Sequence, residues 1–442
     1  MQTADVVIIG AGMAGASAAF FLAPHAKVVL LERESQPGYH ATGRSAAMYS
    51  QSYGNACVRA LTVASGEFYR QPPGGFCDYP LITPRGALTV GAGAQHDSLL
   101  QTWHAMRALV PNIAWWTQDQ VLQRVPVMRP EAAQFAVYEP DAMDMDVHAI
   151  HQGFLRGARQ AGATLACNAE VRRVWRDGAL WCLETPAGCF GAPVLINAAG
   201  AWCDELAALA GVAPIGLVPM RRTAFTFESP SGTDIHDWPL VIAADESFYF
   251  KPDAGVLLAS PANADPVPPQ DVQPEELDVA IAVDRLEAAT TLTVRQVKRK
   301  WAGLRSFVAD KSPVVGFARD APGFFWLAGQ GGYGIQTAPA LGELAAALVR
   351  GLAVPSAMAA LGVRADDLSP LVRPWAACVG PPPAAGGAIH RMRAPEYRPP
   401  PCSSRPTEVA AGARPLVSRH PGSRSAVPQA RPEFDPARSG AW

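Results

Sequence analysis

The feature that most constrains the fold is a strand–glycine–helix–strand pattern in residues 5–32. An apolar run at 6–9 is short enough for a buried parallel strand, and Gly10, Gly12 and Gly15 follow it in G-x-G-x-x-G spacing. Gly10 permits a tight turn, Gly12 lets backbone approach a pyrophosphate, and Gly15 lets the following helix pack closely on the sheet. The free N–H groups at the start of that helix attract phosphate.

A second apolar run, 28–31, ends at Glu32, 22 residues beyond Gly10. A carboxylate at this place accepts the adenosine ribose hydroxyls, which argues against a 2′-phosphate and therefore against NADP. The alternative is a glycine-rich turn in some other α/β fold. Because strand, glycines, helix, second strand and acid occur in order, the pattern predicts a dinucleotide-binding Rossmann unit.

Composition limits the classes of partner. The 442 residues carry a net charge of −2, which gives no general case for nucleic-acid binding. The charge is uneven, since residues 375–442 hold nine Arg and four acidic residues and the remainder is acidic. That tail is rich in Pro, Arg, Ala, Ser and Gly without periodicity, so we predict a disordered tail at 375–442 with no part in the chemistry; binding of RNA or an acidic surface is the alternative.

The eight cysteines are scattered and form no C-x-x-C pair, so we expect no metal site and no redox dithiol. Reduced cysteines favour a cytoplasmic protein. No basic segment precedes the apolar residues 12–23, and no apolar run reaches the ~18–20 residues of a membrane span, so we expect neither a signal peptide nor an integral membrane segment.

Three further segments are candidates to contact the dinucleotide. The polar stretch 33–54 reads as a long loop laid along an extended ligand, with Thr42, Gly43, Arg44 and Ser45 placed to touch it. Small residues at 198–202 follow an apolar strand and permit a second close approach of backbone. Glycines at 329–334 separate a strand from a long helix, whose start offers another site for negative charge.

The middle of the chain predicts a second kind of layer. Segments 217–227, 240–252 and 255–260 alternate apolar and polar residues, as in an antiparallel sheet, and 162–174 is also strand-like. Helical periodicity occurs at 58–69, 99–109 and 149–160, the last capped by Asp144 or Asp146. His148 and His151 on that helix are expected to be surface or packing residues, not ligands.

Longer motifs carry a resemblance to a known family. LERESQPGYHATGRSAA (31–47), INAAGAWCD (196–204), DESFYFKPDAG (245–255), SPANADPV (260–267), WAGLRSFVAD (301–310) and GQGGYGIQT (329–337) resemble the FAD-dependent D-amino-acid oxidase superfamily, and within it the D-arginine dehydrogenases. The resemblance runs from about residue 4 to 374.

The resemblance implies an α/β protein with two discontinuous domains. A Rossmann-type FAD-binding domain would comprise 1–50, 145–215 and 308–374, and an antiparallel-sheet α+β substrate domain would comprise 51–144 and 216–307. It implies non-covalent FAD, a D-amino-acid substrate oxidised at its Cα–N bond by hydride transfer to flavin N5, and an electron acceptor that the sequence does not identify. The imino acid would then hydrolyse to a keto acid and ammonia.

The resemblance also assigns residues. Arg222 and Arg305 would hold the substrate carboxylate, because a guanidinium can pair with it bidentately. Tyr53 and Tyr249 would line the pocket, and Gly332, with Gly331, would orient the amine. A helix starting near Gly334 would place its positive end beside flavin N1 and O2. The expected cofactor contacts are Gly10, Gly12, Ala14, Gly15, Glu32, Arg33, Thr42, Gly43, Arg44, Ser45, Ala47, Val171, Ala199, Gly200, Trp202, Gly303, Gly331, Gly332, Tyr333, Gly334, Ile335, Gln336 and Thr337.

Two positions depart from the D-arginine dehydrogenases. The acid that grips the guanidinium of D-arginine aligns with Ala87, and a pocket histidine aligns with Met48. Losing the acid removes about 1.5–3 kcal/mol for a charged hydrogen bond, and Met makes the pocket more apolar. The sequence therefore predicts a preference for neutral or hydrophobic D-amino acids. An O₂-using glycine or sarcosine oxidase and a non-catalytic flavin-binding protein are the alternatives.

Overall fold

The computed structural model describes residues 1–370, which belong to one compact unit. The predicted disordered tail at 375–442 lies outside the described residues.

One sheet is organised around the N-terminal strand. Its strands, in spatial order, are β10 (Thr164–Ala166), β3 (Val28–Leu31), β2 (Val6–Ile9), β14 (Val194–Asn197), β22 (Phe324–Ala328) and β21 (Val314–Phe317). All neighbours run parallel except β21, which is antiparallel to β22. Strands buried on both faces read as continuous apolar runs, which explains the sequences at 6–9 and 28–31.

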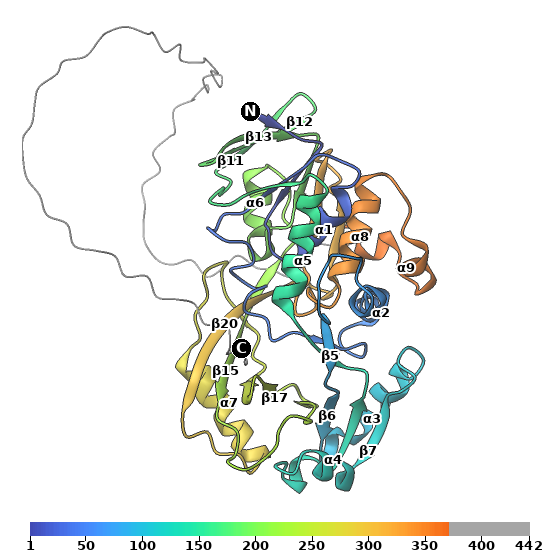
Figure 1. Ribbon diagram of the computed structural model, residues 1–442, viewed down its shortest axis with the longest axis vertical. Helices are drawn as coiled ribbons and strands as arrows, with labels where there is room; N and C mark the ends of the chain where they lie inside the picture. Colours follow the sequence, from blue (N-terminus) through green and yellow to red (C-terminus); the bar gives the residue numbers. More distant parts are fainter. Residues whose placement is uncertain (371–442) are drawn as a thin grey trace, which may run out of the picture. The chain divides into compact units, whose positions relative to one another are not determined.

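Both faces of this sheet are covered. Ile8 and its neighbours pack beneath α1 (Met13–Leu22), α5 (Val147–Gln160) and α8 (Ala338–Val349), which lie together in Figure 1. Val7 and Ile9 pack on the other side against α6 (Cys203–Leu209) and a smaller sheet. The strands of that smaller sheet are β1 (Gln2–Thr3), β13 (Gly188–Ala192), β12 (Leu180–Thr185) and β11 (Arg173–Asp177).

A larger sheet forms the second layer system. Its strands, in spatial order, are β19 (Asp265–Pro266), β15 (Val218–Phe227), β18 (Val256–Ser260), β17 (Tyr249–Asp253), β16 (Leu240–Ala243), β6 (Ala87–Gly91), β8 (Phe135–Glu139) and β7 (Ala114–Thr117), and β20 (Val297–Phe307) pairs with β15. One face packs against α4 (Gln118–Arg124) and α7 (Glu276–Ala289). Part of the other face packs against α3 (His96–Met106).

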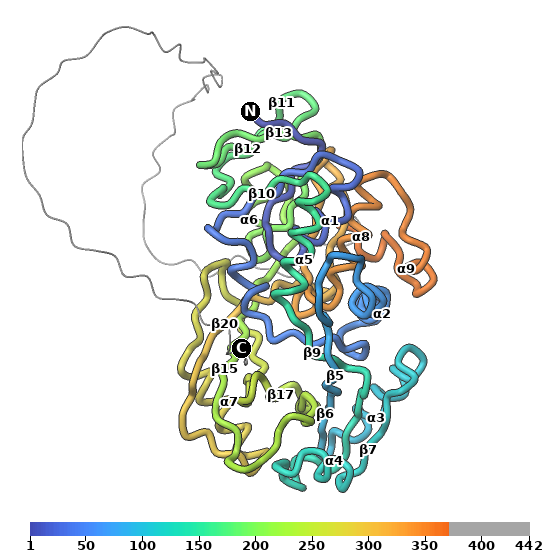
Figure 2. Tube along the Cα trace, viewed as in Figure 1, coloured from blue at the N-terminus to red at the C-terminus, as the bar shows by residue number. Residues whose placement is uncertain are grey.

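The remaining elements connect the two large sheets. They are β4 (Met48–Tyr49), β5 (Ile82–Pro84), β9 (Met143–Met145), α2 (Ala56–Arg70), α9 (Ser356–Ala360), α10 (Ala365–Leu368) and 3-10 turns at Gly93–Gln95, Pro130–Ala132 and Gly200–Trp202. Figure 2 shows that chain segments far apart in sequence, coloured blue, green and orange, combine around the parallel sheet. The α/β fold class is confirmed, and the domain boundaries stay a prediction.

Several local predictions are corrected. The stretch 240–252 is not one strand, because a turn with Glu246 at φ 55° separates β16 from β17. The larger sheet is not wholly antiparallel, since β16 runs parallel to β6. Residues 162–174 form only the short β10 and the start of β11. The last long helix begins at Ala338, not near Gly334.

The cap of α5 is Asp146, whose carboxylate accepts a hydrogen bond from the Ala149 backbone N–H at 2.8 Å. His148 is exposed and His151 is buried with Nε2 2.8 Å from the Ala11 carbonyl oxygen. Burial lowers the pKa of the His151 imidazole, which favours its neutral form. The prediction of surface and packing histidines is therefore confirmed.

Candidate active site

The glycine motif forms the turn that the sequence predicted. Gly10 has φ 99°, and a Cβ there would lie 2.4 Å from the Ala198 carbonyl oxygen. A Cβ on Gly15 would lie 1.9 Å from the Gly10 carbonyl oxygen, so this glycine lets α1 pack on the turn. Gly12 precedes α1 with φ −73°, in extended backbone. The N-terminus of α1, at Gly12, Met13 and Ala14, borders the cavity.

Glu32 stands at the end of β3 and is 8% exposed. Its Oε2 accepts a hydrogen bond from the Ala11 N–H, and its Oε1 accepts one from the Glu34 N–H, both at 3.0 Å. Burial raises the pKa of this carboxyl, and the two backbone hydrogen bonds oppose that rise. Each oxygen keeps a further acceptor site, which suits ribose hydroxyls.

The polar loop after Glu32 is hydrogen-bonded both to the start of α1, beside the parallel sheet, and to β20 of the larger sheet. Thr42 Oγ1 accepts a hydrogen bond from the Met13 N–H at 3.0 Å, at the start of α1. Arg44 Nη1 donates to the Ala302 carbonyl at 3.2 Å, and its guanidinium is ion-paired with Asp271. Trp301 Nε1 donates to the Arg44 carbonyl at 3.0 Å. The loop thus spans from the glycine turn to β20.

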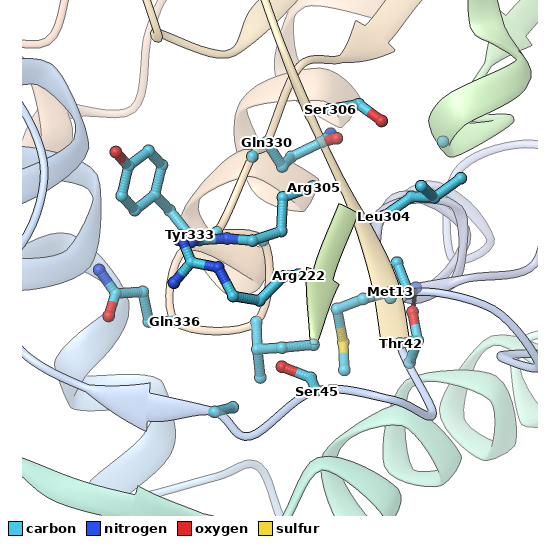
Figure 3. Close-up of a pocket in the computed structure, with 18 of the residues that line it drawn as sticks. Met13, Thr42, Ser45, Arg222, Leu304, Arg305, Ser306, Gln330, Tyr333 and Gln336 are labelled. Carbon is cyan, nitrogen blue, oxygen red and sulfur yellow. Dashed lines mark hydrogen bonds between the residues drawn. The ribbon is translucent and has the colours of Figure 1, made fainter. Parts of the chain in front are cut away.

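Two half-buried guanidinium groups lie side by side at the other end of the cavity, on neighbouring strands β15 and β20 (Figure 3). Arg222 Nε donates to the Asn263 carbonyl at 2.6 Å, and Arg305 Nη2 donates to Tyr53 Oη at 2.5 Å. Burial lowers the pKa of Arg222, and the charge of Arg305 lowers it further. In the described part of the chain neither group forms an ion pair with a carboxylate, so the pair is suited to an anionic ligand.

Arg221, adjacent to Arg222, lies in a different setting. It is ion-paired with Asp278 at 3.0 Å, with Asp265 at 3.4 Å and with Glu275. Successive residues of a strand point to opposite faces. Arg222 is therefore the member of this pair that borders the cavity.

The glycine turn at 329–334 shapes the wall beside Arg305. Gly331 has φ 53°, and a Cβ there would lie 2.1 Å from the Phe307 ring. A Cβ on Gly332 would lie 1.6 Å from Arg305 Nη2, so only glycine leaves room for the guanidinium. Tyr333 contacts Tyr53 edge to face at 5.0 Å, and burial raises the pKa of Tyr333 to about 12.

One cavity of about 920 Å³ is bordered by Gly10 and Glu32 at one end and by Arg222 and Arg305 at the other. This volume is at the upper end of the ~300–1,000 Å³ usual for small-molecule sites. All predicted substrate-pocket and specificity residues border it, namely Tyr53, Tyr249, Arg222, Arg305, Gly332, Met48 and Ala87. Most predicted cofactor contacts also border it, including Ala14, Arg33, Ser45, Ala47, Val171, Ala199, Gly200, Trp202, Gly303, Gly334, Ile335 and Gln336.

Three predicted contacts do not border the cavity: Gly15, Gly43 and Thr337. Gly43 packs on the Gly38 carbonyl, where a Cβ would lie at 2.7 Å. Thr337 is fully buried before α8, with Oγ1 donating to the Tyr333 carbonyl at 2.8 Å. The first turn of α8 therefore starts beyond the glycine turn, and residues 331–336 themselves face the site.

Sequence reasoning missed a buried acid in the cavity wall. Glu139 is 2% exposed and lies opposite Ala87 across β6 and β8. Its carboxylate accepts hydrogen bonds from Ser50 Oγ at 2.7 Å, Gln51 N at 2.6 Å and Ser52 Oγ at 2.5 Å. No local signal in the sequence marks this contact, because it joins residues 87 positions or more apart.

The family comparison decides what this cavity belongs to. A family model described as FAD dependent oxidoreductase (DAO) matches residues 5–348, which include both ends of the cavity. The chain belongs to the DAO family of FAD dependent oxidoreductases.

Individual relatives of this DAO family member match over nearly their whole length. The glycine oxidase of Geobacillus kaustophilus is 25% identical over 363 residues, covering 78% of this chain and 92% of that protein. The N-methyl-L-tryptophan oxidase of Salmonella typhimurium is 25% identical over 366 residues, covering 77% and 93%.

Solved structures share the fold. The G. kaustophilus glycine oxidase superposes with a TM-score of 0.67 at 22% identity, covering 80% of this chain and 96% of that one. The L-alpha-glycerophosphate oxidase of Mycoplasma pneumoniae, solved with FAD bound, superposes with a TM-score of 0.71 at 17% identity, covering 79% and 95%.

The cofactor of this DAO protein is FAD, and the residues present fit it. The cavity runs past Gly10, Gly12 and Ala14 at the N-terminus of α1, where phosphates are favoured. Glu32 offers acceptors for a ribose, and the cavity continues from there to the arginine pair. In the described residues no cysteine borders the cavity, and no helix is long and apolar enough to cross a membrane.

Proposed function

We propose that the protein oxidises the Cα–N bond of D-amino acids with neutral or hydrophobic side groups. The observation that carries the proposal is the pair of half-buried guanidinium groups, Arg222 and Arg305, with no carboxylate partner among the described residues. An α-carboxylate would supply the missing counter-charge and would be held bidentately. The resemblance of segments 245–255 and 301–310 to D-arginine dehydrogenases supports the D configuration.

In this proposal FAD, bound non-covalently, would supply the acceptor for the hydride that leaves the substrate Cα. Arg222 and Arg305 bind the carboxylate, and Tyr53 Oη holds Arg305 in place. Gly332, together with Gly331, orients the amine through its carbonyl, and Tyr249 closes the side of the chamber. The amine gives its proton to water. The resulting imine hydrolyses to a keto acid and ammonia.

The residues around Ala87, where the side group of the substrate would lie, support a preference for neutral substrates. Ala87 presents only a methyl group there, and Met48 adds an adaptable apolar wall. The nearby acid Glu139 already accepts three hydrogen bonds. A guanidinium beside Ala87 would therefore leave water without a dedicated partner on β6 or β8.

This preference predicts the effect of a single substitution. Ala87→Glu should raise kcat/KM for D-arginine by about 10- to 100-fold relative to D-leucine, because a charged hydrogen bond contributes about 1.5–3 kcal/mol. The measurement is steady-state kinetics of both proteins with D-Arg, D-Met, D-Phe and D-Leu. Ala87→Gln, of similar size without the charge, is the matched control. A strong D-Arg preference of the unaltered protein would refute the proposal.

The function itself is tested by anaerobic bleaching of the flavin absorbance with a panel of D-amino acids, using their L enantiomers as controls. Bleaching by the D forms alone is expected. No bleaching by any amino acid would favour a non-catalytic flavin-binding protein.

An O₂-using amine oxidase is the second candidate, favoured by the names of the relatives, glycine oxidase and N-methyl-L-tryptophan oxidase. Comparing hydrogen peroxide formation with dye reduction separates it from a dehydrogenase. We expect dye reduction to dominate, with an electron acceptor other than O₂.

A further inference from the structure

The cavity does not end at Ala87. Thr89 follows on the same face of β6, about 7 Å farther along the strand. Thr89 is flanked by Val137 of β8 and Ile242 of β16, which also border the cavity. Helix α3 supplies the facing wall with Leu99, Thr102 and Met106. We call this extension, defined by these six residues, the α3 arm.

The α3 arm is apolar in character and carries no charge. Leu99 and Val137 are each 5% exposed and belong to one hydrophobic cluster. The Thr102 hydroxyl donates to the Ser98 carbonyl at 2.9 Å, so it is already used within the helix. Met106 gives the wall a flexible thioether that adapts to different shapes. Methylene groups that pack against Leu99, Val137 and Met106 would be stabilised.

We propose that the α3 arm binds the far end of long apolar side groups of the substrate. The proposal rests on the proposed function, because carboxylate binding at Arg222 and Arg305 anchors one end of the substrate. The arginine pair, Ala87 and the α3 arm all border the same cavity. The substrate class is therefore D-amino acids whose side group is long enough to reach the α3 arm, such as the unbranched D-2-aminooctanoate.

The test uses two series of increasing length with the FAD-loaded protein. Unbranched carboxylates from propanoate to decanoate report binding without turnover, measured as Kd by flavin absorbance titration. Unbranched D-2-amino acids from D-alanine to D-2-aminooctanoate report kcat/KM. We expect each added methylene to improve both quantities about fourfold, because burying one CH₂ contributes about 0.8 kcal/mol. The improvement should continue past the length of D-norvaline.

Filling the α3 arm should end the gain in Kd and kcat/KM at a shorter chain length in both series. Thr89→Phe fills it from β6, and Thr102→Phe fills it from the exposed side of α3 without disturbing a buried strand. Each should abolish the gain beyond D-norvaline, measured as the ratio of the values for long and short compounds within one variant. Gln101→Phe is the matched control, because Gln101 is exposed on the same helix and does not border the cavity. It should retain the full gain.

The outcomes separate this inference from the proposed function. If Kd improves with ligand length and the two filling variants remove the gain, but no D-amino acid is oxidised, the α3 arm stands and the proposed function fails. If D-alanine is oxidised but both series level off at the length of D-norvaline, the α3 arm is no subsite. An unchanged length dependence in both filling variants overturns the inference in the same way.

Discussion

At the scale of single residues, the position of Arg305 in the cavity depends on the absence of a side chain at Gly332. A methyl group there would lie 1.6 Å from Arg305 Nη2, so Gly332→Ala must displace the guanidinium. We expect KM for D-amino acids to rise about 10- to 100-fold, since about 1.5–3 kcal/mol of charged hydrogen bonding is lost. Gly334→Ala, whose methyl group would lie 3.2 Å from Gln330 Cβ, should raise KM less. Equal effects of the two substitutions would contradict the placement of Arg305.

Glu139 gives a residue-scale prediction about pH. Burial raises the pKa of its carboxyl above the unfolded value, while hydrogen bonds from Ser52, Ser50 and Gln51 oppose the rise. Its favourable contribution is therefore complete below the unfolded pKa, and is lost as pH rises through the folded pKa. Glu139→Gln removes this titration, so its Tm should fall less than that of the unaltered protein as pH rises from about 4 to 7. Parallel Tm curves would show that Glu139 is not responsible.

At the scale of elements, the β2–α1 turn contains two glycines with different roles. We expect Gly10 to be needed for stability and Gly12 to be needed for cofactor binding. In Gly10→Ala, the alanine would have to adopt the native φ of 99°, and its methyl group would clash with the Ala198 carbonyl oxygen. The Tm of the FAD-free protein should therefore fall. Gly12 has ordinary extended backbone, and a Cβ there would meet only Thr42 Oγ1 at 3.3 Å. Gly12→Ala should therefore leave the FAD-free Tm nearly unchanged while weakening FAD affinity by about 10-fold or more. Thermal unfolding and FAD titration of both variants test the separation.

Elements also show what the sequence could and could not predict. The unit from β2 to β3 was predictable because its strand, glycines and helix are neighbours in sequence. The parallel pairing of β6 with β16 was not, because it joins residues 87–90 to residues 240–243 and no local pattern selects it. The contacts of Glu139 and the wall formed by α3 depend on such pairings, so they were missed. Helix α8 starts at Ala338 and not near Gly334, because the residues before it form hydrogen-bonded turns. One of these bonds joins Thr337 N to the Tyr333 carbonyl at 3.1 Å.

At the scale of the whole molecule, the site is shared by two sheets. Glu32 and the glycine turn at residues 10–15 adjoin the parallel sheet, whereas Arg222 and Arg305 belong to the larger mixed sheet. Arg44 bridges them through the Ala302 carbonyl and Asp271. FAD that contacts both ends should therefore stabilise the described unit as one body. Free FAD at about 100 times its Kd should add about 2.7 kcal/mol to the free energy of unfolding.

Removing FAD should accordingly lower Tm by several degrees, and titrating it back should raise Tm with the logarithm of free FAD above Kd. Arg44→Ala should shift this dependence to higher FAD concentration, because the loop over the cofactor loses its anchor on β20. Differential scanning calorimetry of the FAD-free, reconstituted and Arg44→Ala proteins provides the measurement. A Tm independent of FAD would mean that the cavity does not bind the cofactor in the folded state, and the assignment of both of its ends would then fail together.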